Sequence, residues 1–149
     1  METEVDKGRV KSLGISNCNA EQLRELLRGA RIKPEYVQKR CFANTGWEQE
    51  IRKICKENGI IFQGYSILTA NRYLYKDATM RRIAQRHQKT VQQVIFRFAL
   101  QIGITPLTGS SDAIHIQEDL DVYHSFTLSD NEVSAVEHAG IGKGKRSKH

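Results

Sequence analysis

The heptapeptide Ile-Ile-Phe-Gln-Gly-Tyr-Ser at residues 60–66 decides the expected fold, because it is the clearest β-strand in this chain of 149 residues. It is rich in β-branched and aromatic residues, and a glycine precedes it at position 59. Runs of the same kind occupy residues 10–16, 36–41 and 104–107. The sequence therefore predicts four strands, with Pro106 at a strand end because an interior proline would remove a ladder hydrogen bond.

Helical patterns follow each of these strands. Apolar residues recur at i, i+3 and i+4 after three capping-box sequences, Asn19-x-x-Gln22, Thr90-x-x-Gln93 and Ser129-x-x-Glu132. Thr45-x-x-Glu48 has the same spacing and predicts a further helix start, while a helix lined by Met80, Ile83 and Ala84 and a helix over residues 112–120 complete the pattern. Residues 68–76 are expected to form a longer loop that belongs to a functional site. The predicted order is βαβαβααβαα.

Strands that alternate with helices predict a parallel sheet, because each crossover is long enough to return the chain to the same end. The fold class is therefore α/β. No strand is followed by G-x-G-x-x-G, and the chain contains no G-x-x-x-x-G-K-[ST], so neither the Rossmann fingerprint nor a P-loop is indicated. Barrel-type and flavodoxin-type arrangements remain, and in both the functional groups gather where the strands end.

The charge balance argues against a nucleic-acid-binding domain. The chain has 23 basic and 17 acidic residues, a net charge of +6, but four of the basic residues lie in residues 140–149. Without them, 19 basic and 17 acidic residues leave only +2. We expect residues 1–139 to form the domain and residues 140–149 a basic, flexible tail, and nucleic-acid binding is not expected.

No apolar stretch approaches the roughly 20 residues of a membrane span, and the acidic N-terminus lacks the apolar region of a secretory signal. A cytoplasmic protein without membrane contact is therefore expected. The cysteines Cys18, Cys41 and Cys55 include no C-x-x-C pair, which favours reduced, packed thiols. The histidines show no metal-binding spacing, so no metal site is expected, and His87 and His124 are interpreted as surface or packing residues.

Amide and hydroxyl side chains follow the predicted strands, and their order resembles that of the aldo-keto reductases. The resemblance covers about residues 7–139. It rests on the motifs Gly14-Ile15-Ser16-Asn17, Pro34 with Val37-Gln38, Gly64-Tyr65-Ser66-Ile67-Leu68, Gly103-Ile104-Thr105-Pro106-Leu107 and Ile116-x-Glu118-Asp119-Leu120. The family implies a (β/α)8 barrel that binds NADPH or NADH, and such a barrel needs about 250 residues. This chain is similar to the last four βα units, a parallel half-barrel.

The resemblance also implies a cofactor site. Ser16, Asn17 and Gln38 match the residues that hold the nicotinamide carboxamide, and Tyr65 matches the aromatic ring on which the nicotinamide stacks. The residues that match contacts to the rest of the dinucleotide are Ser66 and Leu68 for the pyrophosphate, Thr108, Gly109, Ser110 and Ser111 for the ribose and adenosine phosphate, and Glu118 and Asp119 for the adenine.

Two positions depart from the family pattern. His115 stands where many members have an arginine for the 2′-phosphate, and Leu107 stands where many have a lysine. Both changes remove fixed positive charge, so the choice between NADP and NAD stays open. The segment from Pro106 to Leu120 is also about two residues longer than the common pattern.

The resemblance provides no catalytic residue. The family's Asp, Tyr, Lys and His are carried by early strands that this sequence does not match, and Tyr65 matches the stacking ring rather than the acid. We therefore assign no catalytic residue and expect no carbonyl reduction by this chain alone.

Three functions are compatible with these features. The chain is a nicotinamide-binding half-barrel of an oxidoreductase that needs its missing half from another chain, a non-catalytic interaction module, or the result of a truncated gene product or a misplaced start codon, with no independent function. A half-barrel exposes two sheet edges and, we expect, an apolar layer that opposite strands would fill. A homodimer, closed by a two-fold axis into an eight-stranded ring, or aggregation is therefore expected.

Overall fold

Four parallel strands lie side by side in the order in which the chain forms them. In this computed structural model, which describes residues 1–141, the strands are β1 (Gly14–Ser16), β2 (Tyr36–Arg40), β3 (Ile61–Tyr65) and β4 (Ile104–Pro106). The register sets Ser16 beside Gln38, and Gln38 beside Gln63. The predicted parallel α/β fold is confirmed, and Pro106 ends its strand. Most of the predicted basic tail, from residue 142 onward, lies outside the described residues.

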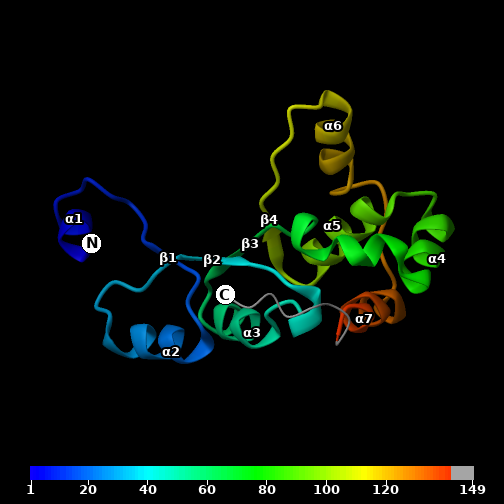
Figure 1. Cartoon of the computed structure of the whole chain (residues 1–149). Helices are drawn as coiled ribbons and strands as arrows, with labels where there is room; N and C mark the ends of the chain where they lie inside the picture. The colour runs from blue at the N-terminus through cyan, green and yellow to red at the C-terminus, as the bar shows by residue number, and fades with distance from the viewer. Residues whose placement is uncertain (142–149) are drawn as a thin grey trace.

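Helices follow each strand, as Figure 1 shows, and three of the predicted capping boxes are present. The helices are α1 (Glu2–Asp6), α2 (Ala20–Gly29), α3 (Gln49–Glu57), α4 (Ala78–His87), α5 (Val91–Gln101), α6 (Ala113–Asp121) and α7 (Asp130–Ala139). Asn19, Thr90 and Ser129 each accept a hydrogen bond from the backbone three residues on. No helix within residues 1–141 is both long and apolar enough to span a bilayer.

The predicted capping box at Thr45 is wrong. Residues Ala43–Thr45 form a 3-10 turn, and α3 begins only after Glu48, whose φ of 58° is left-handed. The turn carries Trp47 into the core, where its ring centroid lies 5.2 Å from that of Phe98. Glu48 then faces Lys39, with Nζ and Oε2 3.5 Å apart. Burial of the Trp47 indole and the Lys39–Glu48 ion pair therefore stabilise the chain before α3, where no side-chain cap is present.

The other differences concern short elements. β1 starts at Gly14 rather than at residue 10, and residues Thr69–Lys76 form a 3-10 segment, η2, instead of an irregular loop. The sequence patterns also missed α1, a helix of 5 residues with no buried side chain. A helix this short lacks the apolar periodicity by which longer helices are predicted.

The helices cover one face of the sheet. Val37, Phe62 and Ile104 are at most 2% exposed and point to the helical layer. The opposite face carries a row of polar residues, one from each strand: Ser16, Gln38, Gln63 and Thr105 are register neighbours. Ile61, two residues before Gln63, points to the same face and is 45% exposed beside Tyr36. The expected uncovered apolar layer is therefore present only in part, because the row of Ser16, Gln38, Gln63 and Thr105 is polar.

Gly64 allows β3 and β4 to pack closely against the chain that follows β2. A Cβ atom at this position would lie 2.6 Å from Cγ2 of Ile104 and 2.8 Å from Sγ of Cys41. Neither neighbour is the end of a flexible side chain, since Cys41 and Ile104 are both buried. Only glycine leaves the strands at this separation.

We predict that Gly64→Ala lowers the free energy of unfolding by about 1–3 kcal/mol, because the added methyl group overpacks the core. Denaturant unfolding followed by far-UV circular dichroism measures the change. Gly29→Ala is the matched control: no heavy atom lies within 4 Å of the position that its Cβ would take, so stability should stay equal or rise slightly. Equal stability of Gly64→Ala and the unmodified chain would contradict the packing argument.

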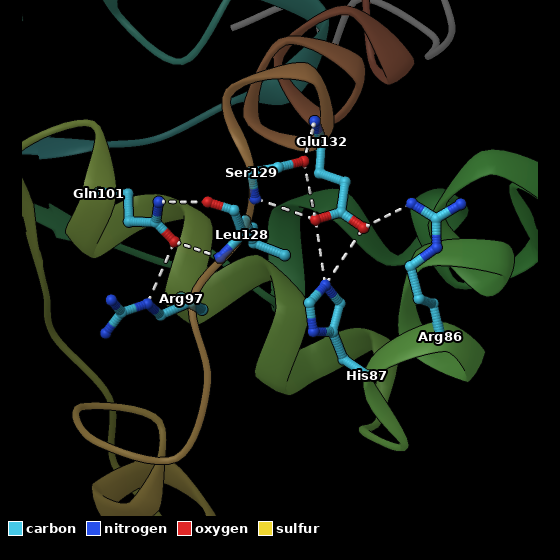
Figure 2. A network of polar contacts seen from close by, with 7 residues as sticks. All are labelled: Arg86, His87, Arg97, Gln101, Leu128, Ser129 and Glu132. Atoms are coloured by element: carbon cyan, nitrogen blue, oxygen red, sulfur yellow. Dashed lines mark hydrogen bonds and ion pairs between the residues drawn. The ribbon is translucent and has the colours of Figure 1, made fainter.

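A polar network joins α4 to the start of α7. Figure 2 shows His87 and Arg86 of α4 converging on the Glu132 carboxylate, with His87 Nε2 3.1 and 3.0 Å from its two oxygens. Ser129 donates its backbone N–H to the same carboxylate over 2.9 Å. His87 is thus a structural residue, as interpreted from the sequence.

The environment of Glu132 holds its carboxyl pKa at about 2. Burial acts to raise the pKa, but the hydrogen bonds from the Ser129 backbone, from His87 and from the Ser129 hydroxyl, together with the charge of His87, outweigh burial and lower it. A carboxyl group whose pKa is depressed in the folded state stabilises the fold above its unfolded pKa. That contribution is lost as the pH falls from about 4.5 toward 2.

We predict that Glu132→Gln destabilises the protein by roughly 2 kcal/mol at neutral pH, and that the difference shrinks as the pH falls from about 5 to about 3. Urea unfolding at several pH values measures both effects. Asp130→Asn, an exposed change in the same helical turn, should show neither. A pH-independent difference would show that the carboxylate is not the stabilising form.

Candidate functional site

The four residues predicted to hold a nicotinamide lie together at the carboxyl ends of β1, β2 and β3. Ser16 ends β1 as the register neighbour of Gln38, and the Asn17 backbone N–H donates to the Gln38 carbonyl over 2.9 Å. Tyr65 Oη donates to Asn17 Oδ1 over 3.0 Å, which ties the ring at the end of β3 to the end of β1. Parallel pairing therefore brings together groups 48 residues apart in the chain.

Two of these strand ends turn sharply through left-handed residues. Asn17 has a φ of 58°, and Ser66, the residue after β3, has a φ of 55°. Asparagine tolerates this region, but serine adopts it at a cost in backbone energy. The turn after β1 is fixed from β2, because Lys39 Nζ donates to the Cys18 carbonyl over 2.9 Å. Backbone strain of this kind collects at binding sites, where the surrounding structure enforces it.

A hollow of about 240 Å³ lies between the ends of β3 and β4. Its lining includes Ser66, Leu68, Thr108 and Gly109, four of the residues that match the pyrophosphate and ribose contacts. A second hollow of about 240 Å³ lies on the open face and is lined by Ser16, Gln38 and Gln63. The structure thus places four predicted residues in the first hollow and Ser16 and Gln38 in the second, while Asn17 and Tyr65 line neither.

The residues predicted to contact the adenine and the adenosine phosphate do not converge on a common recess. Ser110, Ser111 and His115 are exposed, and His115 Nδ1 lies 3.9 Å from Asp112 Oδ2. Asp119 accepts a hydrogen bond from the Thr108 hydroxyl over 2.9 Å, whereas Glu118 on α6 is half-buried. None of Ser110, His115, Glu118 or Asp119 lines the two hollows. This part of the predicted site is an open surface.

Several residues at the site were not predicted from the sequence. Gln38 Nε2 donates to Gln63 Oε1 over 3.3 Å, and Arg40, the register neighbour of Tyr65, is exposed on the same face. The alternation of strand side chains could have found both, since Gln63 lies two residues before Tyr65 and Arg40 two residues after Gln38. Thr69 and Phe96 line the hollow beside Ser66, and only the tertiary structure places them there.

Asn71 links the chain segments that follow β2 and β3. Its side chain is fully buried, accepts from the Ala43 backbone N–H over 2.8 Å, and donates to the carbonyls of Cys41 and Ile67 over 3.0 and 2.7 Å. Ile67 follows directly after the left-handed Ser66. Asn71 therefore fixes the spacing between two strand ends of the site.

The thiols and histidines show no catalytic arrangement within residues 1–141. The pKa of Cys41 is raised to about 12, by burial first and by the charge of Glu48 second, and burial raises the pKa of Cys55 to about 11. Such thiols stay protonated and are poor nucleophiles. In the same part of the chain, no group of three or more His, Cys, Asp or Glu side chains is placed to hold a metal ion.

Comparison with known proteins defines first the class and then the family. The chain superimposes with a TM-score of 0.85 on the crystal structure of MGS-M4, an aldo-keto reductase enzyme from a deep-sea metagenome library, covering 96% of this chain and 53% of that one at 28% identity. The fold is therefore part of a (β/α)8 barrel. Residues 1–141 match the sequence profile of the Aldo/keto reductase family, and the chain belongs to that family.

Curated relatives show the same partial coverage. The chain is 33% identical to an NAD(P)H-dependent D-xylose reductase of Kluyveromyces lactis, with 91% of this chain and 45% of that protein aligned. It is 34% identical to aldose reductase B of Dictyostelium discoideum, with 91% and 43% aligned. The chain thus spans slightly less than half the length of these two relatives.

We predict that Asn71→Leu lowers the free energy of unfolding by about 3 kcal/mol, because the buried Ala43 N–H and two carbonyls lose their partner. Chemical unfolding at neutral pH measures the loss. Asn131→Leu, an exposed change in α7, is the control and should stay within about 0.5 kcal/mol of the unmodified chain. Similar values for the two variants would contradict the role of Asn71.

Proposed function

We propose that residues 1–139 form a dinucleotide-binding half-barrel that holds NADPH or NADH along the carboxyl ends of its strands. The observation that carries the proposal is the grouping of Ser16, Asn17, Gln38 and Tyr65 through the Tyr65–Asn17 and Asn17–Gln38 hydrogen bonds. Amide and hydroxyl groups can bind a carboxamide without introducing a competing charge, and a tyrosine ring offers a flat surface. Membership of a family with NAD(P)H-dependent relatives supports the same ligand.

Each part of the ligand has its own proposed contacts. Ser16, Asn17 and Gln38 bind the carboxamide, while Tyr65 stacks against the ring. Ser66 and Leu68 contact the pyrophosphate in the hollow that Thr108 and Gly109 also line. On the exposed side, Ser110, Ser111 and His115 lie toward the ribose and adenosine phosphate, and Glu118 and Asp119 toward the adenine.

The two cofactors are expected to bind with similar, weak affinity. Discrimination in favour of NADPH needs fixed cations at its 2′-phosphate. Leu107 carries no charge, and His115 is exposed with an acidic neighbour, Asp112, 3.9 Å away. The exposed Arg40 at the strand ends belongs to the nicotinamide end of the site, since it is the register neighbour of Tyr65.

We further propose that this chain does not reduce carbonyl compounds by itself. The hydride chemistry is that of the nicotinamide, and the protein must supply a proton to the carbonyl oxygen. Tyr65 is not placed for that task, because its hydroxyl hydrogen bond is to Asn17 rather than to a lysine or histidine. Activity would then depend on a proton donor that residues 1–141 do not supply.

Binding and turnover can be tested separately. Titration with NADPH and with NADH, followed by nicotinamide fluorescence and by thermal unfolding, should show binding and stabilisation at millimolar ligand. The same preparation should give no NADPH oxidation with an aldehyde substrate. Absence of any fluorescence change and of any stabilisation would overturn the binding proposal, and steady turnover by the pure chain would overturn the inactivity proposal.

We predict that Tyr65→Ala weakens dinucleotide binding several-fold, since stacking contributes on the order of 1 kcal/mol, whereas His115→Ala has little effect. Dissociation constants from the fluorescence titration measure both. His115 is the control because it is exposed and already departs from the family pattern. Equal affinities of Tyr65→Ala and the unmodified chain would contradict the stacking contact.

A further inference from the structure

We propose that two copies of this chain close on each other around a two-fold axis parallel to the strands, with α6 of each copy seated in a groove beside β1 of the other. The proposal concerns the sheet edges and the outer helices and does not rest on dinucleotide binding. Ser16 and Asn17, assigned above to the carboxamide, also line the groove, so the two proposed contacts share these residues. It follows from the backbone groups at the two edges, from an apolar groove and a matching helix face, and from the distribution of charge.

The two edges are complementary in their backbone groups. The Asn17 N–H and the Leu13 carbonyl bond to β2 and to the residue before it, so in a parallel strand the N–H and carbonyl groups of Gly14 and Ser16 point away from the sheet. On β4, the Leu107 N–H bonds to Gly64, which turns Ile104 and Pro106 outward. Because Pro106 has no N–H, the β4 edge has fewer donors and pairs better with β1 than with another β4.

A groove of about 820 Å³ runs along the outer side of β1, between this strand, α1 and α2. No residue of β2, β3 or β4 lines it, so it lies beyond the edge of the sheet. Its apolar lining is contributed by Leu13, Ile15, Leu26, Ala30, Ile32 and Pro34. A groove of this kind fits the apolar face of a helix that accompanies an incoming strand.

The helix next to the other edge has such a face. α6 follows β4 and projects away from the other helices in Figure 1, and none of its residues is buried. Ile116 and Leu120 share one side of α6 and are 44% and 58% exposed, and Tyr123, two residues past the helix end, is 46% exposed. A contiguous apolar stripe on an exposed helix marks an interaction surface.

Charge disfavours the alternative contact in which two α6 helices meet. The chain contains no lysine or arginine from residue 98 to residue 142, although this stretch has seven acidic residues. Four of the seven, Asp112, Glu118, Asp119 and Asp121, lie on or next to α6. Residues 1–33, which form the β1 edge, hold seven basic and five acidic residues. Contact of α6 with a second α6 would therefore be repulsive, whereas residues 1–33 carry a small net positive charge. The groove itself is lined by Glu2 and Glu25 and by no lysine or arginine, so α6 would enter it through its apolar side rather than through ion pairs.

Two-fold symmetry satisfies both edges of both copies at once. β4 of one copy pairs with β1 of its partner and the reverse pair forms on the opposite side, so the assembly stops at two chains. The polar rows of Ser16, Gln38, Gln63 and Thr105 then face a shared interior. Polar side chains suit a hydrated interior, so contact is made by the edges and by α6 in its groove.

The oligomeric state of the 149-residue chain tests the proposal, with mass measured by light scattering after size exclusion and without dinucleotide. The expected result is a dimer with twice the 17.0 kDa chain mass. Leu120→Glu should weaken the dimer at least about tenfold, because it places a charge in the apolar contact. Ile114→Glu, on the opposite side of the same helix and 71% exposed, is the matched control and should not weaken it. Unchanged circular dichroism would show that both variants fold.

A second variant fills the groove instead of changing the helix. Gly29 lines the groove, and no heavy atom lies within 4 Å of a Cβ placed there, so Gly29→Trp should fold and yet exclude the partner's α6. Mixing Gly29→Trp with Leu120→Glu leaves one intact helix and one intact groove, so a heterodimer weaker than the unmodified dimer should form. A monodisperse monomer of the unmodified chain, oligomers that grow with concentration, or no association in the mixture would each overturn the proposal.

Discussion

Parallel pairing of β1 to β4 is the constraint on which the rest of the structure depends. It acts together with the sequential strand order: right-handed crossovers then return along one face of the sheet, which is why the helices bury Val37, Phe62 and Ile104 and leave the other face uncovered. It also places all carboxyl ends at one edge. Ser16, Gln38 and Tyr65 become neighbours for this reason, although long segments of chain separate them.

The chain segments that follow the strands at the site are held by contacts whose loss would lower the stability of the fold. Left-handed residues follow β1 and β3, and strain of this kind persists only where neighbouring groups enforce it. Lys39 fixes the Cys18 carbonyl after β1, and Asn71 joins the Ala43 N–H to the Ile67 carbonyl across two strand ends. Gly64 supplies the close approach of β4. The same residues therefore stabilise the fold and shape the proposed ligand site.

The uncovered face gives the half-barrel a different character from the interior of a closed barrel, which is packed with branched apolar side chains. A hydroxyl- and amide-rich row can remain in contact with water, so the open face alone does not require a partner. The unsatisfied surfaces are elsewhere: the outward backbone groups of β1 and β4, the groove beside β1 and the apolar stripe of α6. The proposed dimer therefore depends on contacts at the sheet edges and not on the open face.

The sequence by itself determined the parallel α/β fold and three helix starts, because local periodicity and capping depend on near neighbours. The grouping of Ser16, Asn17, Gln38 and Tyr65 was predicted from a family resemblance instead. The hydroxyl and amide groups of Asn19, Thr90 and Ser129 act within their own turn. Only the tertiary structure moved the start of α3 past Glu48, since burial of Trp47 against Phe98 outweighs a local cap. It also decided the role of Asn71, the pairing of His87 with Glu132 and the polarity of the open face, because each depends on residues from different strands or helices.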